Sequence, residues 1–177
     1  MKIEKLAPIH KEQVRSVCLK TAHGRISRRK RAFLLNMYCD HYLDHGTAFV
    51  LTDAGNVVRG YILCAENWED YIRDMAPRAA AFPFPYSILA KLEFRSYRAY
   101  REAYPAHLHI DILESYTGCG KGKLLMKALL DHLREQQVPG VMLNVAASNH
   151  RAIRFYEKCG FTLLKDNKFS LTLGMKL

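Results

Sequence analysis

Residues 106–125 read AHLHIDILESYTGCGKGKLL, and this stretch decides the fold. It begins as an alternating strand, passes through a turn that holds Gly118, Gly120 and Gly122, and ends in the start of a helix. Glycines at a strand-to-helix junction let backbone N–H groups approach an anion closely. The N-terminus of the helix behind them carries about half a positive charge. The stretch therefore predicts a cradle for phosphate groups.

Two well-known phosphate motifs do not match this cradle. A dinucleotide fingerprint, GxGxxG, cannot start at Gly118, because position 123 is Lys123. A P-loop needs four residues between its first glycine and its Gly-Lys-Ser/Thr, but only three residues separate Gly118 from Gly122, and Leu124 follows the lysine. The turn is either a phosphate cradle of another kind or a tight glycine-rich turn without a ligand.

Composition favours one globular domain over the 177 residues, 1–177. Hydrophobic residues make up 49% of the chain, which is enough for a core, and there is no apolar run of about 18 residues. The N-terminus lacks the apolar region of a signal peptide. Five scattered cysteines without a CxxC pair indicate free thiols and a cytoplasmic location, and we expect no metal site.

The formal net charge of +10 indicates an anionic partner. The densest basic run lies in 25–31, at the expected start of a helix. Neither zinc-finger spacing nor an RNP-like aromatic pattern accompanies it, so we do not expect nucleic acid as a partner. A cofactor with several phosphates, or an acidic substrate, fits the charge as well.

Periodicity and turn residues predict alternating elements along the chain. The expected strands are 2–6, 47–52, 57–65, 106–113, 141–145, 161–164 and 169–177, and the expected helices are about 10–21, 28–44, 89–103, 121–136 and 149–158. Segment 66–105 is the hardest to assign, because prolines interrupt it and seven aromatic residues fall within 82–104. We interpret it as a helical, aromatic-rich insertion or lid, either packed as a subdomain or facing a substrate.

Two motifs resemble the GNAT superfamily of N-acetyltransferases. Residues 116–125, YTGCGKGKLL, are similar to motif A of that family, Q/R-x-x-G-x-G/A, and residues 149–161, NHRAIRFYEKCGF, are similar to its motif B, N-x-x-A-x-x-F-Y-x-K-x-G-F. The resemblance implies an α/β (α+β) fold with a mixed, mostly antiparallel central sheet flanked by helices. It also implies that strands 106–113 and 141–145 splay apart at the cofactor site.

The resemblance further implies that acetyl-CoA is the cofactor and a primary amine the acceptor, attacked directly in a ternary complex. Pyrophosphate would accept hydrogen bonds from amides over 118–123, pantetheine would pair near Ile112 and Leu113, and an amide near Leu113 would stabilise the thioester oxyanion. The residues implied in cofactor binding are Ile112, Leu113, Thr117, Gly118, Cys119, Gly120, Lys121, Gly122, Lys123, Asn149, Ala152, Phe155 and Tyr156.

Tyr156 is the candidate general acid, because the family tyrosine at this position lies near the departing sulfur. On the 106–113 strand, His107, His109 and Asp111 share one face and Leu108, Ile110 and Ile112 the other. We expect Asp111 or His109 to be the general base, with Glu114 a weaker candidate. The alternative is a structural hydrogen-bond network.

Two points leave alternatives open. Thr117 occupies the position of the family's first Gln or Arg and brings no charge, although Lys121 or Lys123 can compensate. A non-catalytic CoA-binding or interaction module with a degenerate GNAT fold is therefore the alternative function. The 106–113 strand also resembles bacterial relatives of the acetyltransferase-like domain at the end of some O-GlcNAcases. The acceptor is a small-molecule amine or a peptide lysine, no membrane partner is expected, and family members often form homodimers.

Overall fold

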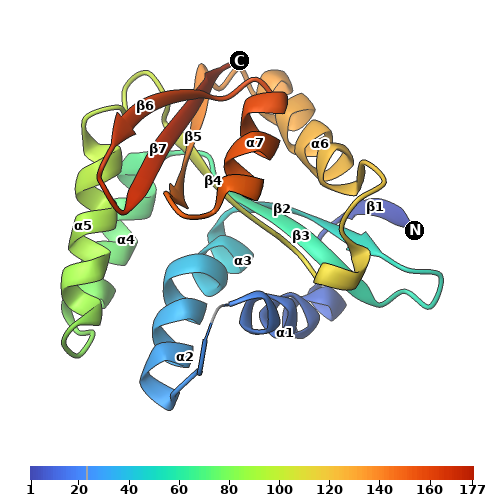
Figure 1. Ribbon diagram of the computed structural model, residues 1–177, viewed down its shortest axis with the longest axis horizontal. Helices are drawn as coiled ribbons and strands as arrows, with labels where there is room; N and C mark the ends of the chain where they lie inside the picture. Colours follow the sequence, from blue (N-terminus) through green and yellow to red (C-terminus); the bar gives the residue numbers. More distant parts are fainter. Residues whose placement is uncertain (23) are drawn as a thin grey trace.

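The computed structural model describes residues 1–22 and 24–177, and the strands of these residues form one seven-stranded sheet (Figure 1). The strand order is β1-β2-β3-β4-β5-β7-β6, so the two halves of the chain meet between β4 and β5. The strands are β1 (Lys2–Lys5), β2 (Thr47–Thr52), β3 (Val58–Ala65), β4 (Ala106–Ile112), β5 (Gly140–Ala146), β6 (Thr162–Asp166) and β7 (Ser170–Lys176).

The β4–β5 pair is the exception in an otherwise antiparallel sheet. These two strands run parallel and pair only at Ala106 with Val141 and at His107 with Met142. Beyond these pairs the strands diverge, whereas β3 stays paired with β4 as far as Ile112. The mixed, mostly antiparallel sheet and its splayed strand pair, both expected from the sequence, are confirmed.

Helices cover both faces of the sheet and bury two apolar clusters. Helices α1 (Lys11–Thr21), α2 (Arg28–Leu35), α3 (His41–His45), α4 (Trp68–Ala80) and α5 (Tyr86–Arg98) pack on one face, and α6 (Lys121–Glu135) and α7 (His150–Lys158) pack on the other. The alternation of β4 matches these faces. Leu108 belongs to the cluster under α6, and His107 lies among aromatic rings under α3 and α4.

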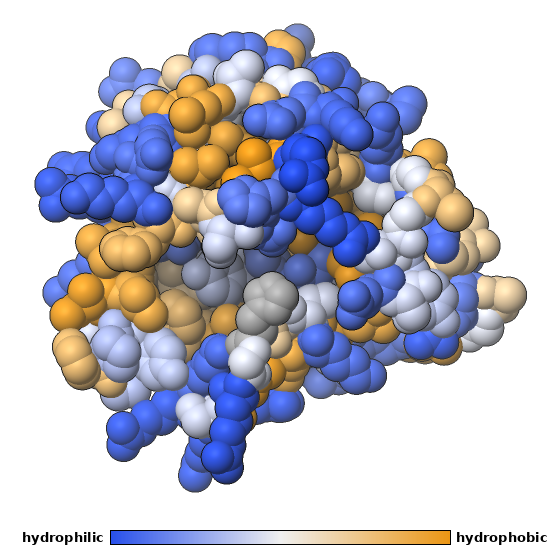
Figure 2. All heavy atoms as spheres, viewed as in Figure 1, coloured by the Kyte–Doolittle hydropathy of each residue, from blue (hydrophilic) through white to orange (hydrophobic). Residues whose placement is uncertain are grey.

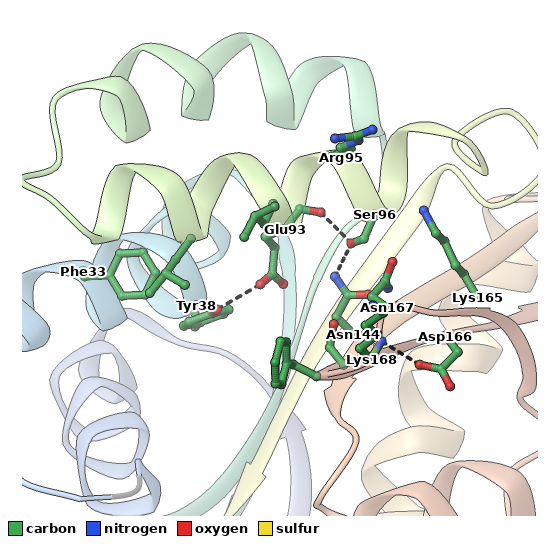
Figure 3. Close-up of a pocket in the computed structure, with 14 residues that line it drawn as sticks. Phe33, Tyr38, Glu93, Arg95, Ser96, Asn144, Lys165, Asp166, Asn167 and Lys168 are labelled. Atoms are coloured by element: carbon green, nitrogen blue, oxygen red, sulfur yellow. Dashed lines mark hydrogen bonds between the residues drawn. The ribbon is translucent and has the colours of Figure 1, made fainter.

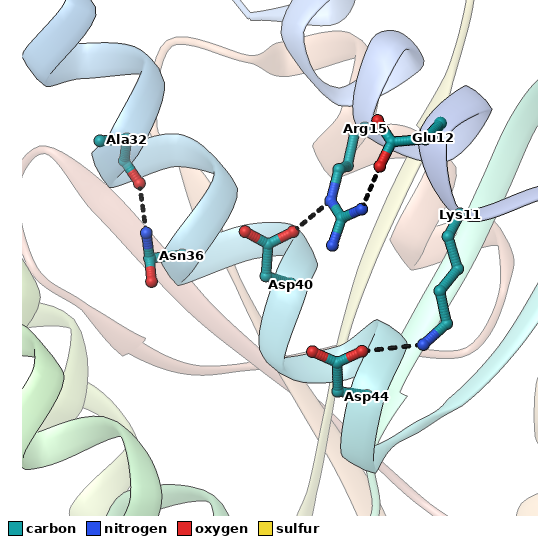
Figure 4. Close-up of polar contacts among 7 residues, drawn as sticks. All are labelled: Lys11, Glu12, Arg15, Ala32, Asn36, Asp40 and Asp44. Atoms are coloured by element: carbon teal, nitrogen blue, oxygen red, sulfur yellow. Dashed lines mark hydrogen bonds and ion pairs between the residues drawn. The ribbon is translucent and has the colours of Figure 1, made fainter.

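Local chemistry explains where the helices begin. Ser27 caps α2 by accepting a hydrogen bond from the amide of Lys30, and Asn67 caps α4 in the same way. The expected helix over 28–44 continues from α2 through a π-helical stretch, Asn36–Asp40, into α3. Figure 4 shows how α1 is fastened to this helix: Arg15 pairs with Asp40 at 2.6 Å, and Lys11 pairs with Asp44 at 2.8 Å.

Segment 66–105 contains two helices where the sequence predicted one. The expected helix over 89–103 begins earlier, at Tyr86 after Pro85, and ends at Arg98. Helix α4 was not predicted, because Pro77 lies within it and hides the periodicity of its buried side, which carries Trp68, Tyr71, Met75 and Ala79.

Candidate active site

The splay between β4 and β5 opens into a cavity of about 850 Å³, which we call the splay cavity. Its walls come from the end of α1, from β4, from the turn before α6, from the end of β5 and from α7. Figure 2 shows that this face of the molecule is hollowed near its middle, where the strands diverge in Figure 1. All but one of the predicted site residues line this cavity; the exception is Cys119, which is exposed at the tip of the turn.

The turn before α6 presents unpaired amides. Gly118, Cys119 and Gly120 have φ angles of +88°, +48° and +74°, so the backbone passes through three successive left-handed residues. Glycine tolerates this region at no steric cost. Within residues 1–22 and 24–177, no hydrogen bond is donated by the amides at positions 118, 119, 120, 122 and 123. Five free N–H groups at a helix N-terminus can bind an anion.

The space around the cradle also suits a phosphate-bearing ligand. A Cβ added at Gly118 or Gly120 would meet no atom within 4 Å, so the turn is open on that side. At Gly122 a Cβ would lie 3.0 Å from the Phe155 ring, so this glycine lets α6 approach α7 closely. Lys121, Lys123 and Arg151 line the same cavity and add positive charge. The residues present therefore fit the pyrophosphate of acetyl-CoA.

Hydrogen bonds within the protein already use two groups at the expected cofactor contacts. The amide of Leu113 donates a hydrogen bond to the carbonyl of Arg59 at 2.9 Å, so it points to β3 and is not free to bind a thioester oxygen. Because alternate residues of an antiparallel strand point their amides to opposite sides, the amides of Ile110 and Ile112 face the splay. The Thr117 hydroxyl donates a hydrogen bond to the carbonyl of Glu114 at 2.8 Å, so its proton is not available to a phosphate oxygen.

Helix α7 closes the other side of the cavity. Asn149 caps it by accepting a hydrogen bond from the amide of Ala152 at 3.1 Å. Tyr156 is 8% exposed and packs against the rings of Phe155 and Phe161. Burial raises the pKa of Tyr156 well above its ordinary value of 10.0, and Asp111 and Cys159 raise it further. The phenol therefore keeps its proton at neutral pH.

The polar face of β4 holds a hydrogen-bonded pair. The Nε2 atom of His109 lies 3.1 Å from Oδ2 of Asp111, which also accepts a 2.7 Å hydrogen bond from the Tyr61 hydroxyl. Burial would lower the pKa of His109, but Asp111 and Cys18 outweigh it and raise that pKa to about 10. Burial would likewise raise the pKa of Asp111, but His109 and Tyr61 hold it below 3.8. The two groups therefore form an ion pair.

His107 does not join this pair. It is fully buried, its ring lies 4.2 Å from the Tyr71 ring, and burial lowers its pKa to about 3. Neither of its ring nitrogens has a hydrogen-bond partner among the described residues. It is therefore a neutral core residue. Glu114, the weaker base candidate, is exposed at the rim of the splay cavity.

A second cavity, of about 650 Å³, adjoins the first, and we call it the α5 cavity (Figure 3). It lies between α2, α5 and the turn that joins β6 to β7. Its apolar walls come from Phe33, Leu89, Leu92 and Phe169, its polar floor from Tyr38, Glu93, Ser96 and Asn144, and its charged rim from Arg95, Lys165, Asp166 and Lys168. Phe169 is 89% exposed, so an apolar surface faces this opening.

Asn144 and Tyr38 connect the two cavities. Asn144 lines both, and its side chain is fixed by Ser96 and by the Thr172 hydroxyl, which donates to it at 2.8 Å. The Tyr38 hydroxyl donates to Glu93 at 3.0 Å, and its ring stacks on His109 with 5.2 Å between centroids. Burial raises the pKa of Glu93 above its ordinary value of 4.5. A carboxylate with a raised pKa therefore faces the α5 cavity, and Asn144 lies where the two cavities meet.

The sequence reasoning missed Glu93, Asn144 and Tyr38. For Asn144 a signal existed, since it is the single polar residue in the apolar strand GVMLNVA. Glu93 lies on α5 at the boundary between the exposed and the buried side of the helix. The sequence around it is what one would expect around an ordinary surface glutamate.

The sequence as a whole matches a known family. The family model described as "Acetyltransferase (GNAT) family" matches residues 19–161, which is most of the chain. The chain therefore belongs to the GNAT family of acetyltransferases, in which acetyl-CoA is the acetyl donor.

Several proteins are similar to this chain. The crystal structure of SsHAT has a TM-score of 0.83 and 28% identity, covering 99% of this chain and 97% of that one. Mycothiol acetyltransferase of Thermomonospora curvata is 48% identical over 27% of this chain and 16% of its own length. The bS18-alanine N-acetyltransferase of Haemophilus influenzae is 48% identical over 30% of this chain and 36% of its own. The chain thus spans well under half of these two curated relatives.

In the part of the chain that the structure describes, no helix combines the length and the apolar character that a membrane crossing requires.

Proposed function

We propose that this chain catalyses acetyl transfer from acetyl-CoA to a small primary amine. The observation that carries the proposal is the row of five unpaired amides at the N-terminus of α6, opening onto the splay between β4 and β5. Acetyl-CoA, when bound, supplies the acetyl group as a thioester. The five unpaired amides of the turn would hold its pyrophosphate, and the amides of Ile110 and Ile112 would be available to its pantetheine arm.

Tyr156 acts as the general acid in this proposal. Its raised pKa keeps the phenol protonated, and it lines the splay cavity beside Asn149 and Ala152 of the same helix. A protonated phenol can donate a hydrogen bond to the sulfur as negative charge develops on the departing thiolate. Asn149 fixes the start of the helix and with it the position of Tyr156.

The general base is better sought at Glu93 than at the pair expected from the sequence. Within their ion pair, His109 is already protonated and Asp111 is a weakened proton acceptor. Glu93 has a raised pKa and faces the α5 cavity, so its carboxylate is the stronger base. We assign His109 and Asp111 to positioning, because the stacked Tyr38 ring links them to Glu93.

The acceptor enters through the α5 cavity. Apolar walls favour a compact apolar or aromatic body, the floor offers Glu93 and Asn144 to an amine, and the rim offers Arg95 and Lys165 to an anionic group. We therefore propose a small amine that carries a carboxylate or phosphate, in preference to a peptide lysine. The helical segment 66–105 then supplies one wall of the acceptor site and works with the rest of 1–177 as one acetyltransferase domain.

The test is thiol release from acetyl-CoA with a panel of acceptors. The panel pairs an aromatic monoamine with the corresponding aromatic amino acid, and adds an amino sugar and a lysine peptide. We expect the amino acid to have the highest kcat/KM. A preference for the peptide would contradict the acceptor class, and tight CoA binding without turnover of any amine would favour the non-catalytic alternative.

Three finer expectations remain proposals. Kinship with the acetyltransferase-like domain of O-GlcNAcases rests on the resemblance of the β4 strand alone. A homodimer and a cytoplasmic location rest on the family resemblance and on the free cysteines. Size-exclusion chromatography with light scattering measures the oligomeric state.

A further inference from the structure

Three metal-binding side chains converge away from both cavities, between α3 and α4. His41 and His45 lie one turn apart on α3, and Asp74 comes from α4. One donor atom from each of the three lies within 4.8 Å of the others. The two helices are in direct contact here, since the ring of His41 packs edge-on against that of Tyr71 at 4.9 Å.

These side chains lack other partners. His41 is 2% exposed, and its Nδ1 atom is buried without a hydrogen bond. Neither Asp74 nor His45 makes a hydrogen bond or ion pair within the described part of the chain, and the His45 ring lies 5.2 Å from that of His41. A buried imidazole without a partner is unfavourable. A cation bound by the converging donor atoms would stabilise this arrangement and offset the free energy lost by burying the imidazole without a partner.

We propose that His41, His45 and Asp74 bind one zinc ion. Two imidazole nitrogens and one carboxylate oxygen form a donor set typical of Zn²⁺, with water in the fourth position. Calcium and magnesium prefer oxygen ligands only, and copper(I) prefers sulfur. Ligand atoms about 2.0–2.1 Å from zinc lie roughly 3.3 Å apart in a tetrahedron, so the present spacing needs only a small movement of the exposed His45.

Neighbouring charges are compatible with a cation here. Asp44 attracts a cation and Arg78 repels one, but Asp44 is already paired with Lys11. Zinc would tie α4, the first helix of segment 66–105, to the body of the fold, and so support the segment that carries Glu93.

A competing cluster is satisfied without a metal. Cys18, His109 and Asp111 also have donor atoms within 4.8 Å of one another. There, however, the imidazole and carboxylate already bond to each other at 3.1 Å, and the Tyr61 hydroxyl takes a further position on the carboxylate. The α3–α4 cluster has no such internal pairing, so we assign the zinc site to it.

Calorimetric titration of Zn²⁺ into the metal-stripped protein tests this site. We expect one equivalent to bind with micromolar or tighter affinity and to raise the melting temperature. His45→Ala and Asp74→Asn, which alter exposed or half-exposed side chains, should each weaken binding by about tenfold or more. Cys18→Ser and the exposed His150→Ala are the controls, and neither should change the affinity.

Co²⁺ in place of Zn²⁺ gives a spectroscopic readout that does not depend on acetyl transfer. The proposal predicts tetrahedral visible bands without the near-ultraviolet charge-transfer band of a thiolate ligand. A thiolate band, or binding that is lost in Cys18→Ser, would show that the metal binds instead to the cluster of Cys18, His109 and Asp111. No binding up to about 100 μM Zn²⁺, or affinity unchanged in both His45→Ala and Asp74→Asn, would overturn the proposal.

Discussion

The two cavities differ in what builds them. The wall of the splay cavity at 118–123 consists of backbone amides, arranged by one short turn between β4 and α6. The α5 cavity consists of side chains from α2, α5, β5 and the turn between β6 and β7. A backbone site is local in the sequence, so a short motif can specify it. A side-chain site is assembled from distant segments, so no local motif records it.

In our proposal the backbone cradle binds the coenzyme common to the family, and the side-chain cavity determines which acceptor is used. The amides of the turn before α6 would bind the part of the ligand that all acetyl-CoA-dependent relatives share, and this role constrains mainly the glycine positions of the turn. The residues of the α5 cavity, such as Glu93 and Phe169, meet the acceptor in our proposal, and they can vary without disturbing the cradle. Each variant below is chosen to separate the contributions of the two cavities.

Tyr156→Phe should have the largest effect on catalysis. Removing the hydroxyl removes the proposed proton donor while the ring still packs against Phe155, so kcat should fall by about 10²–10³-fold. Affinity for CoA should change little, because the cradle is untouched. Stopped-flow and steady-state thiol release measure both quantities. Tyr104→Phe, at the paired end of β4 and β5, is the control, and an equal loss there would contradict the assignment.

Glu93→Gln should lower kcat/KM by about 10²-fold, because the amide cannot accept a proton. The carboxylate is the active form and its pKa is raised by burial, so the wild-type rate should rise with pH through a value above 4.5. That rise should disappear in the variant. Glu102→Gln, on an exposed side chain, is the control. A rise of the rate with pH that persists in Glu93→Gln and vanishes in Asp111→Asn would show that the general base is Asp111 and not Glu93.

Local pattern predicted the strands of the sheet and the glycine-rich turn before α6, and the resemblance to the GNAT family implied the splay. Two details depended on tertiary context that local pattern does not record. The amide of Leu113 points to β3, since pairing register decides which side an amide faces. The segment 66–105 forms two helices, since burial of Trp68 and Tyr71 outweighs the proline within α4. Glu93 could not be found from the sequence, because its position in a cavity depends on α2 and β5.

Asp111→Asn should mainly affect stability and its pH dependence. In the folded protein the pKa of His109 is about 10, above its ordinary 6.5, so the pair stabilises the fold fully below pH 6.5 and stops doing so as pH rises to 10. Both side chains are about a quarter exposed, so we expect a loss of about 2 kcal/mol at neutral pH.

Urea unfolding from pH 6 to pH 10 measures this effect. The wild type should lose stability across that range, and Asp111→Asn should lack this component. Asp131→Asn breaks an exposed pair with Lys127 and should cost less than about 0.5 kcal/mol. A wild-type stability that does not change between pH 6.5 and 10 would show that His109 and Asp111 are not an ion pair.

Gly120→Ala should have the smallest effect, and the quantity that changes should be the affinity for the coenzyme. The residue has a φ of +74° and open space around it, so an alanine is strained only by its backbone, at about 1 kcal/mol. The affinity for CoA should fall by about fivefold with kcat nearly unchanged. Gly55→Ala, in the β2–β3 turn, is the control. A fall in kcat without a change in affinity would contradict a binding role for the turn.

Amide hydrogen exchange with and without saturating CoA tests the central claim most directly. We expect slower exchange in peptides that cover 118–123, because those amides would donate to the pyrophosphate, and unchanged exchange across α5, Tyr86–Arg98. Protection of α5 with none at 118–123, or no protection anywhere at about 1 mM CoA, would contradict the division between a backbone cradle for the coenzyme and a side-chain cavity for the acceptor.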